Sequence, residues 1–336
     1  MPCSAAFIQA TDRTSYSAMN LSSKILKNTT LQRLYLFLII LLIPAIHFIP
    51  VNTFAQECIN TKFLFDVKPN ADQPSDLAIA PNGDIYLVDG INNRIVVVDS
   101  EGRWKFEFGT EGAGNGQFNR PLGIDISENG NVFIADTGNH RIQAFDLKGN
   151  FQNAFTVRTG SQQTRSDPVD VAVSKFKNYL YVSDNDNQKI RVYDRSGNLE
   201  FEWGKFGEGQ GEFRYPGIMA INQINEVFVV DVLNTRVQKF DPFGQFITSI
   251  GIWGVLPGKF FRPKGVAIDK QNRVFISDSY MGVIQVFTDV GSFIGIVCDT
   301  GKKRTFNTPV GIAVDKNNRL LVVEMRSNKI TVLKIL

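Results

Sequence analysis

The 336-residue sequence predicts an all-β protein, a six-bladed β-propeller of four-stranded antiparallel blades. Two observations carry this prediction. A unit of about 35 residues, in which turn residues separate four short apolar runs, occurs repeatedly. A proline opens each unit, at residues 74, 121, 168, 216, 263 and 309, so the period is 46 to 48 residues. A fixed period in this range with four strands per repeat is typical of propellers.

The repeat at residues 121–155 shows the pattern most clearly. Its apolar runs read GIDI, NVFIAD, RIQAFD and NFQNAF, and sequences such as ENG and DLKG between them favour chain reversal. The first three strands of the repeats carry apolar residues on both faces, as expected for sheets packed between two others. The fourth strand alternates more clearly between apolar and polar residues, which is typical of an outer edge strand.

The ends of the chain predict how the ring closes. The last repeat ends at Leu336, after its third strand, and lacks a fourth. Upstream of the first proline, residues 62–67 read KFLFDV, the pattern of the missing strand. We therefore expect this N-terminal strand to complete the sixth blade and to remove the exposed sheet edges. The predicted propeller domain spans residues 61–336.

Residues 1–55 form an N-terminal extension with an export signal. Basic residues precede an apolar segment at 34–51, and Thr53 and Ala55 suit a signal peptidase, so a hydrophobic export helix is expected. The alternative is an uncleaved membrane anchor, since 18 residues barely span a bilayer. Met1 or Met19 is the start. In either case the propeller is exported, and contacts a membrane only through an uncleaved segment.

Two cysteines, Cys58 and Cys298, lie within or next to the predicted propeller. Export would permit a disulfide. However, the predicted strand order places the two residues near opposite faces, about 20 Å apart at the usual strand rise, which exceeds disulfide reach. We therefore expect two free thiols.

The charge is nearly balanced, with 36 basic and 33 acidic residues. No overall field favours nucleic acid or an acidic membrane surface. A nucleic-acid partner is therefore not expected.

The repeat resembles the NHL-repeat propellers, through Pro-x-Gly-Ile-Ala-Val-Asp, Asn-Val-Phe-Ile-Ala-Asp and Asp-x-x-Asn-x-Arg-Ile. The resemblance covers about residues 61–336 and implies the propeller fold. Its members include binding domains, RNA-binding domains and a lyase. The first repeat faintly resembles the amidating lyase branch, which is associated with a histidine-ligated zinc ion. Only His140 remains in the predicted propeller, and one imidazole cannot supply that site.

Function is expected where the repeat is broken. Asp76 and Asp170 replace the glycine that opens the first strand of other repeats, and Asp125 replaces an alanine. Carboxylates near the axis could contact a ligand, or Asp76 and Asp170 could hold Ca²⁺, which prefers oxygen ligands. The alternative is hydrogen bonding to axial water or backbone. No cofactor other than this Ca²⁺ is expected.

The longer loops predict a binding face. The loops between second and third strands and those between blades lie on one face and carry Arg120, Tyr215 and Arg262. The Asp-x-x-N-x-Arg/Lys sequences on this face recur in four repeats, so we interpret them as structural.

The resulting expectation is an exported, non-enzymatic binding module that presents this loop face to a protein or a glycan. The first alternative is a Ca²⁺-dependent hydrolase of the lactonase type, with Asp76, Asp125 and Asp170 at its site. The second alternative is an RNA-binding propeller.

Overall fold

A computed structural model describes residues 58–157, 166–174 and 177–336. The expected extension and export helix at residues 1–55 lie outside the described residues, so both remain predictions. In the part of the chain that the structure describes, no helix is long and apolar enough to cross a membrane. Residues 54–336 form a single structural unit, and the description that follows concerns this unit.

Antiparallel sheets build this unit, and their strands follow the predicted repeats. Four sheets have four strands each: β2–β5 (Leu77–Ile79, Ile85–Asp89, Arg94–Val98, Trp104–Phe108), β8–β11 (Ile124–Ile126, Val132–Asp136, Arg141–Phe145, Phe151–Thr156), β12–β15 (Pro168–Val173, Leu180–Asp184, Lys189–Tyr193, Leu199–Trp203) and β16–β19 (Pro216–Ile221, Val227–Asp231, Arg236–Phe240, Phe246–Ile250). The fifth sheet contains β20–β23 (Pro263–Ile268, Val274–Asp278, Val283–Phe287, Phe293–Asp299), β25–β27 (Pro309–Val314, Arg319–Glu324, Lys329–Ile335), β1 (Cys58–Val67) and the short β24 (Lys302–Lys303). Two further short strands, β6 (Thr110–Glu111) and β7 (Gln117–Phe118), pair in a loop.

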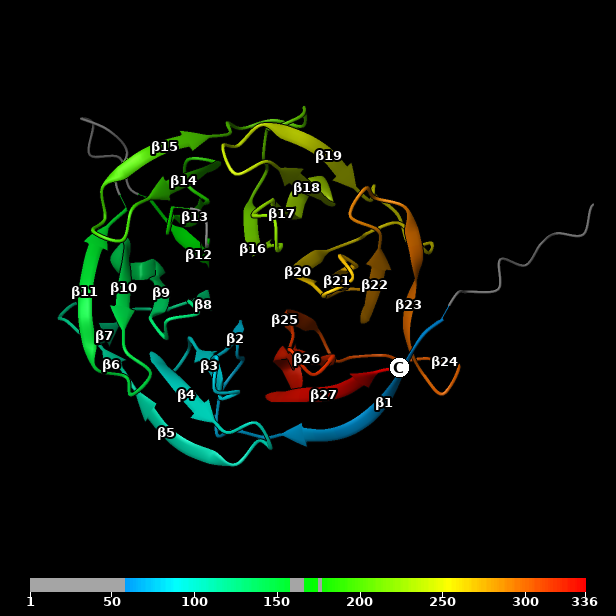
Figure 1. Cartoon of the computed structure of the whole chain (residues 1–336), viewed down its shortest axis with the longest axis horizontal. Coiled ribbons are helices and arrows are strands. Elements are labelled where there is room, and N and C mark those ends of the chain that lie inside the picture. Colours follow the sequence, from blue (N-terminus) through cyan, green and yellow to red (C-terminus); the bar gives the residue numbers. More distant parts are fainter. Residues whose placement is uncertain (1–57, 158–165, 175–176) are drawn as a thin grey trace, which may run out of the picture. The chain divides into compact units, whose positions relative to one another are not determined.

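The sheets are arranged around a common axis, as Figure 1 shows. The first strand of each repeat is innermost, and each contacts the innermost strand of the next repeat, from β2 through β8, β12, β16 and β20 to β25. Strand β25 in turn contacts β2, so these strands close a circle. The all-β propeller prediction is therefore confirmed, and its innermost strands bring residues from all the repeats together.

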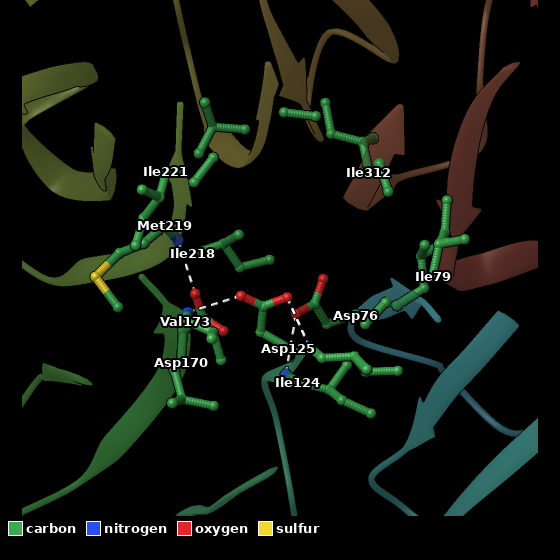
Figure 2. Close-up of a pocket in the computed structure, with 18 of the residues that line it drawn as sticks. Asp76, Ile79, Ile124, Asp125, Asp170, Val173, Ile218, Met219, Ile221 and Ile312 are labelled. Atoms are coloured by element: carbon green, nitrogen blue, oxygen red, sulfur yellow. Dashed lines mark hydrogen bonds between the residues drawn. The ribbon is translucent and has the colours of Figure 1, made fainter. Parts of the chain in front are cut away.

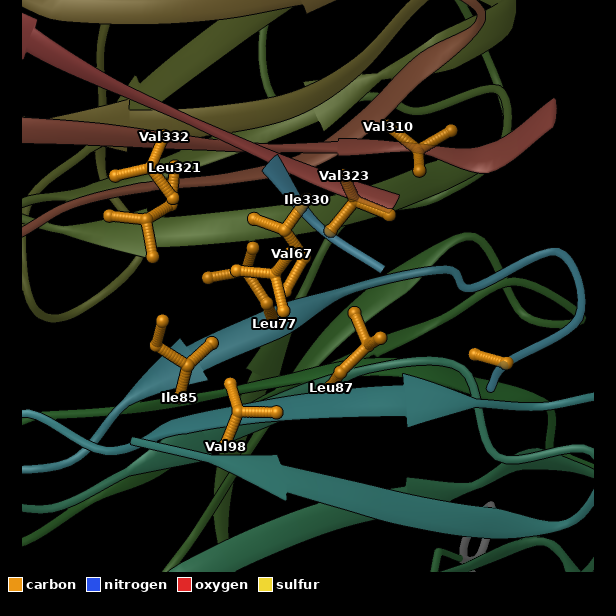
Figure 3. Packing of buried hydrophobic residues seen from close by; sticks show 11 residues of the cluster. Val67, Leu77, Ile85, Leu87, Val98, Val310, Leu321, Val323, Ile330 and Val332 are labelled. Carbon is orange, nitrogen blue, oxygen red and sulfur yellow. The ribbon is translucent and has the colours of Figure 1, made fainter. Parts of the chain in front are cut away.

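Strand β1 closes the ring as predicted. Its residues from Thr61 to Val67 pair antiparallel with β27 and supply the missing outer strand. A layer of aliphatic side chains, among them Val67, Leu77, Leu87 and Val323, then fills the space between the last repeat and the first (Figure 3). Burial of apolar surface therefore holds the two ends of the chain together.

The prediction of two free thiols is wrong, because Cys58 and Cys298 form a disulfide with a Cα–Cα distance of 5.4 Å. Strand β1 begins at Cys58, four residues before the predicted strand, and its first residues pair in parallel with β23. Asn60 lies opposite Cys298 in this pairing. The disulfide therefore links the closing strand to the preceding repeat, and the parallel pairing of β1 with β23 explains why the last two predicted blades form one sheet.

The recurrent Asp-x-x-N-x-Arg sequences are structural, as expected. In the second repeat, buried Asp136 accepts hydrogen bonds from the Asn119 main chain at 2.8 Å and from Asn139 at 2.9 Å. It also pairs with Arg141 at 2.7 Å. Asp89 and Asp231 repeat these contacts in their own repeats. These acids fix the loops that lead into each repeat, so their charges are satisfied within the blade.

Candidate active site

The innermost strands enclose an axial cavity of about 310 Å³. Strands β16, β20 and β25 contribute only aliphatic side chains and Met219 to its lining. Strands β2, β8 and β12, or the residues that precede them, contribute Asp76, Asp125 and Asp170. Figure 2 shows the three carboxyl groups close together, with Ile79, Ile218, Ile221 and Ile312 around them. The cavity thus has an acidic side and an apolar side.

Each of the three carboxylates accepts a hydrogen bond from the main chain of the next repeat. The Oδ2 atom of Asp125 accepts from the N–H of Val173 at 2.7 Å, and Oδ2 of Asp170 accepts from Met219 at 2.7 Å. Oδ2 of Asp76 accepts from Ile124 at 3.3 Å. The other oxygen of Asp125 accepts from its own neighbour, Ile126. These bonds hold the carboxyl groups in fixed orientations at the cavity wall.

Two glycines make room for two of the acids. A Cβ atom on Gly123 would lie 2.3 Å from Oδ1 of Asp170, and one on Gly311 would lie 2.3 Å from Oδ1 of Asp76. Both would also lie less than 3.0 Å from the backbone Cα of the same aspartate, so the clash cannot be relieved by the side chain alone. Sequence reasoning missed these glycines. The signal was present in the sequence, because Gly123 and Gly311 occupy the repeat position that Asp76 and Asp170 occupy in adjacent repeats.

We expect Gly123→Ala to displace Asp170 from the cavity wall and to destabilise the fold by about 1–3 kcal/mol, as overpacking does. Gly217→Ala is the matched control, since its Cβ would meet only the side chain of Val232 at 3.2 Å and the next contact is at 3.6 Å. Urea unfolding of both variants measures the difference. Equal stabilities of the two variants would contradict the fit described for Gly123.

The three acids differ in their tendency to ionise. Burial raises the pKa of Asp76 to about 8, and the nearby Asp125 adds to this shift. Burial and the proximity of Asp76 raise the pKa of Asp170 well above its usual range. Burial raises the pKa of Asp125 only to about 6, because two main-chain N–H groups and Arg195 favour its charged form. At pH 7, Asp125 is therefore mostly ionised, while Asp76 is mostly protonated.

The cavity does not fit a calcium ion. Among the described residues, no group of three or more His, Cys, Asp or Glu side chains is placed to hold a metal. Each axial aspartate already uses one oxygen as an acceptor for a main-chain N–H group, and most of the remaining lining is aliphatic. Calcium requires six to eight oxygen ligands. The expectation that Asp76 and Asp170 hold a metal is therefore not supported.

The other three predicted site residues lie outside the axial cavity. The main-chain N–H groups of Arg120 and Tyr215 donate to side chains of the preceding repeat, at 2.7 Å and 2.6 Å. Both residues have positive φ angles, which suits the loop where one repeat leads into the next. Arg262 lines a separate cavity of about 360 Å³ with Arg326. The structure thus brings together the three aspartates but not the three loop residues.

Comparisons with known proteins support the fold. Residues 118–145 match the NHL repeat family model. The predicted NHL-type repeat is thereby confirmed over this segment. A search of curated proteins found no match.

Three solved structures are similar in fold but distant in sequence. A gluconolactonase from Xanthomonas campestris is 12% identical, with a TM-score of 0.63, and the match covers 84% of this chain and 96% of that one. A streptogramin B lyase is 13% identical, with a TM-score of 0.59 and coverage of 82% and 98%. The virginiamycin B lyase from Staphylococcus aureus is 16% identical, with a TM-score of 0.54 and coverage of 77% and 80%. At these identities the likeness shows the fold.

The expectation of a non-enzymatic binding module is contradicted. Solved structures that are similar in fold include a gluconolactonase and lyases, which are enzymes. The axial cavity extends along the innermost strands to Ser127 and Glu128, at the tight turn after β8 on the opposite face.

Proposed function

We propose that the axial cavity is the active site of a hydrolase that cleaves a lactone or a related small ester by acid–base catalysis. The observation that carries this proposal is the group of three aspartates held by main-chain hydrogen bonds at the wall of one cavity. Their environments favour different protonation states, since the pKa of Asp125 is raised to about 6 and that of Asp76 to about 8. Two carboxyl groups whose environments separate their pKa values can act as base and acid at neutral pH. The apolar side of the cavity suits an uncharged ring.

In this proposal the ionised carboxylate of Asp125 accepts a proton from a water molecule while the water oxygen attacks the ester carbonyl carbon. The carboxylic acid of Asp76 donates its proton to the alkoxide oxygen as the ester C–O bond breaks. Asp170 lines the same cavity, and burial and the proximity of Asp76 raise its pKa well above its usual range. One water molecule is consumed, and the product is a hydroxy acid. The proton that Asp125 holds returns to Asp76 through solvent.

Hydrolysis is favoured over lyase chemistry by the position of the histidine. A variant of the virginiamycin B lyase with one histidine replaced by alanine is catalytically inactive. Among the described residues of this chain, His140 is the single histidine, and it does not line the axial cavity. Its ring instead contacts the carbonyl oxygen of Ser166 at 2.8 Å and the carboxylate of Asp167 at 3.2 Å. Because a gluconolactonase has a similar fold, a sugar lactone is the first substrate to test.

The test is a panel of aldonolactones and simple γ-lactones incubated with the enzyme in ¹⁸O-labelled water. We expect a hydroxy acid with one labelled oxygen, and a bell-shaped dependence of kcat/KM on pH with limbs near 6 and 8. An unsaturated product without label would show elimination instead. No turnover of any lactone or ester would overturn the proposal.

The same acids predict how stability depends on pH. An aspartate with a pKa near 4 when unfolded and about 8 when folded binds more protons in the native state. The free energy of unfolding therefore falls as pH rises from about 4 to about 8, because the unfolded state releases this proton in that range while the folded state keeps it. The Asp76→Asn variant has no carboxyl group at this position, so it loses this pH dependence. We expect the unfolding free energy of the variant, relative to that of the wild type, to rise by at least about 1 kcal/mol from pH 5 to pH 9. Urea unfolding of the variant and the wild type at pH 5 and pH 9 measures this change. A difference in unfolding free energy that is the same at both pH values would contradict the prediction.

We also propose that the protein works in an oxidising compartment, as the predicted export implies. The disulfide between Cys58 and Cys298 supports this proposal, since such bonds persist mainly outside the reducing cytosol.

A further inference from the structure

A second cavity adjoins the axial cavity on the face of the tight turns. Its volume is about 360 Å³, and its lining is almost entirely polar: Ser127, Glu128, Asn129, Asn131, Val173, Ser174, Asn178 and Arg195. Ser127, Glu128 and Val173 line both cavities, so the two lie side by side. Val173 is also the residue whose main-chain N–H group holds Asp125. A ligand in the axial cavity could therefore extend past Val173 into the polar cavity.

Arg195 is the cation of this second cavity. It lies in the turn between β14 and β15, and its guanidinium group stacks over the ring of Phe133 at 4.6 Å. Its Nη1 atom is buried and has no hydrogen-bond partner among the described residues. Burial lowers the pKa of Arg195, whereas the charge of Asp125 raises it. A buried N–H group of a charged side chain destabilises the fold when it has no acceptor. The presence of such a group here points to a ligand that supplies the acceptor.

We infer that Arg195 binds a carboxylate group of the substrate, while the ester carbonyl of the same molecule lies beside Asp125. This inference rests on the proposed hydrolase function and names the substrate class: a lactone or ester that bears a carboxylate. A planar guanidinium group matches a carboxylate in geometry and charge. Glu128 lines both cavities and Asp125 lines the axial one. Because these acids repel anions, a singly charged carboxylate is favoured over a doubly charged phosphate.

Binding without turnover tests the inference independently of catalysis. The probes are tetrahydrofuran-2-carboxylate and tetrahydrofuran-2-carboxamide, which have the same ring and no hydrolysable ring ester. Titration calorimetry on the whole protein should show at least about tenfold tighter binding of the carboxylate, as expected for a hydrogen bond between charged groups. Arg195→Gln should abolish this preference, and Arg195→Lys should retain part of it. The control is Arg103→Gln, an exposed arginine in the corresponding turn of the first repeat, which should leave the preference unchanged.

Turnover gives the second readout. For a carboxylate-bearing γ-lactone, Arg195→Gln should lower kcat/KM by about 10- to 100-fold more than it does for the matching carboxamide lactone, mainly through KM. The comparison between the two substrates removes any effect of the substitution on Asp125, which both substrates share. If the wild type binds both probes equally, or if Arg195→Gln keeps the preference, the inference fails even where lactones are hydrolysed. A preference that depends on Arg195 without any hydrolysis would support the carboxylate site and overturn the proposed hydrolase.

Discussion

Replacing Asp125 by asparagine is expected to lower kcat for lactone hydrolysis by about 10²- to 10⁴-fold with little change in KM. The asparagine has nearly the same shape, and its side-chain oxygen can still accept the hydrogen bond from Val173, although the bond from Ile126 to the other oxygen is lost. The amide cannot take a proton from water, however, so the general base is lost. Steady-state kinetics across pH 5 to 9 measures the effect, and the limb of the pH profile near 6 should disappear with the base.

Asp146→Asn is the matched control for this substitution. Asp146 lies in the same repeat, in the turn after β10, and is absent from the lining of the axial cavity. Its carboxylate accepts hydrogen bonds from Lys148 and Asn150 within the turn. We expect this variant to keep kcat within about twofold, as for a surface change remote from the site. If Asp125→Asn were as active as the control, Asp125 would not be the base.

Removing the disulfide is expected to have the largest effect on stability. The double variant Cys58→Ser/Cys298→Ser should lose about 2–5 kcal/mol of unfolding free energy and melt roughly 5–15 °C lower. The bond joins residues 240 positions apart, so its loss greatly increases the conformational freedom of the unfolded chain. It also ties the closing strand β1 to β23, so its loss frees the end of β1 to separate from β23.

Thermal unfolding with and without a reducing agent measures this contribution. Reductant should lower the melting temperature of the wild type toward that of the double variant and leave the double variant itself unchanged. The account of ring closure would be wrong if reductant had no effect on the wild type, or if thiol titration of the unfolded, unreduced protein found both Cys58 and Cys298 free.

Most of the fold could be predicted from the sequence because the repeat is regular. Six prolines at a nearly constant period located the innermost strands, and the missing last strand identified residues 62–67 as its replacement. The disulfide could not be predicted in the same way. The parallel pairing of Cys58–Thr61 with β23 is a contact between adjacent repeats, and the periodic pattern reports only contacts within a repeat.

The candidate site was partly predictable for a related reason. Asp76, Asp125 and Asp170 differ from the residues at the same positions of other repeats, and this difference marked them as candidates. Their pKa values could not be inferred, because these depend on burial and on mutual distances across three repeats. Arg195 carried no signal at all, since it occupies an ordinary turn sequence and becomes distinctive only through the cavity that it lines.

The central claim is that the axial aspartates hold different protonation states at neutral pH, and NMR titration of ¹³C-carboxyl-labelled aspartate tests it most directly. The variants Asp76→Asn, Asp125→Asn and Asp170→Asn would each remove one resonance and so assign the three groups. We predict that Asp125 titrates near 6 and Asp76 near 8, so that Asp76 is still mostly protonated at pH 7, and that the pKa of Asp170 is raised well above its usual range. If all three carboxyl groups were ionised by pH 5, the cavity would lack its acid and the proposed chemistry would be contradicted.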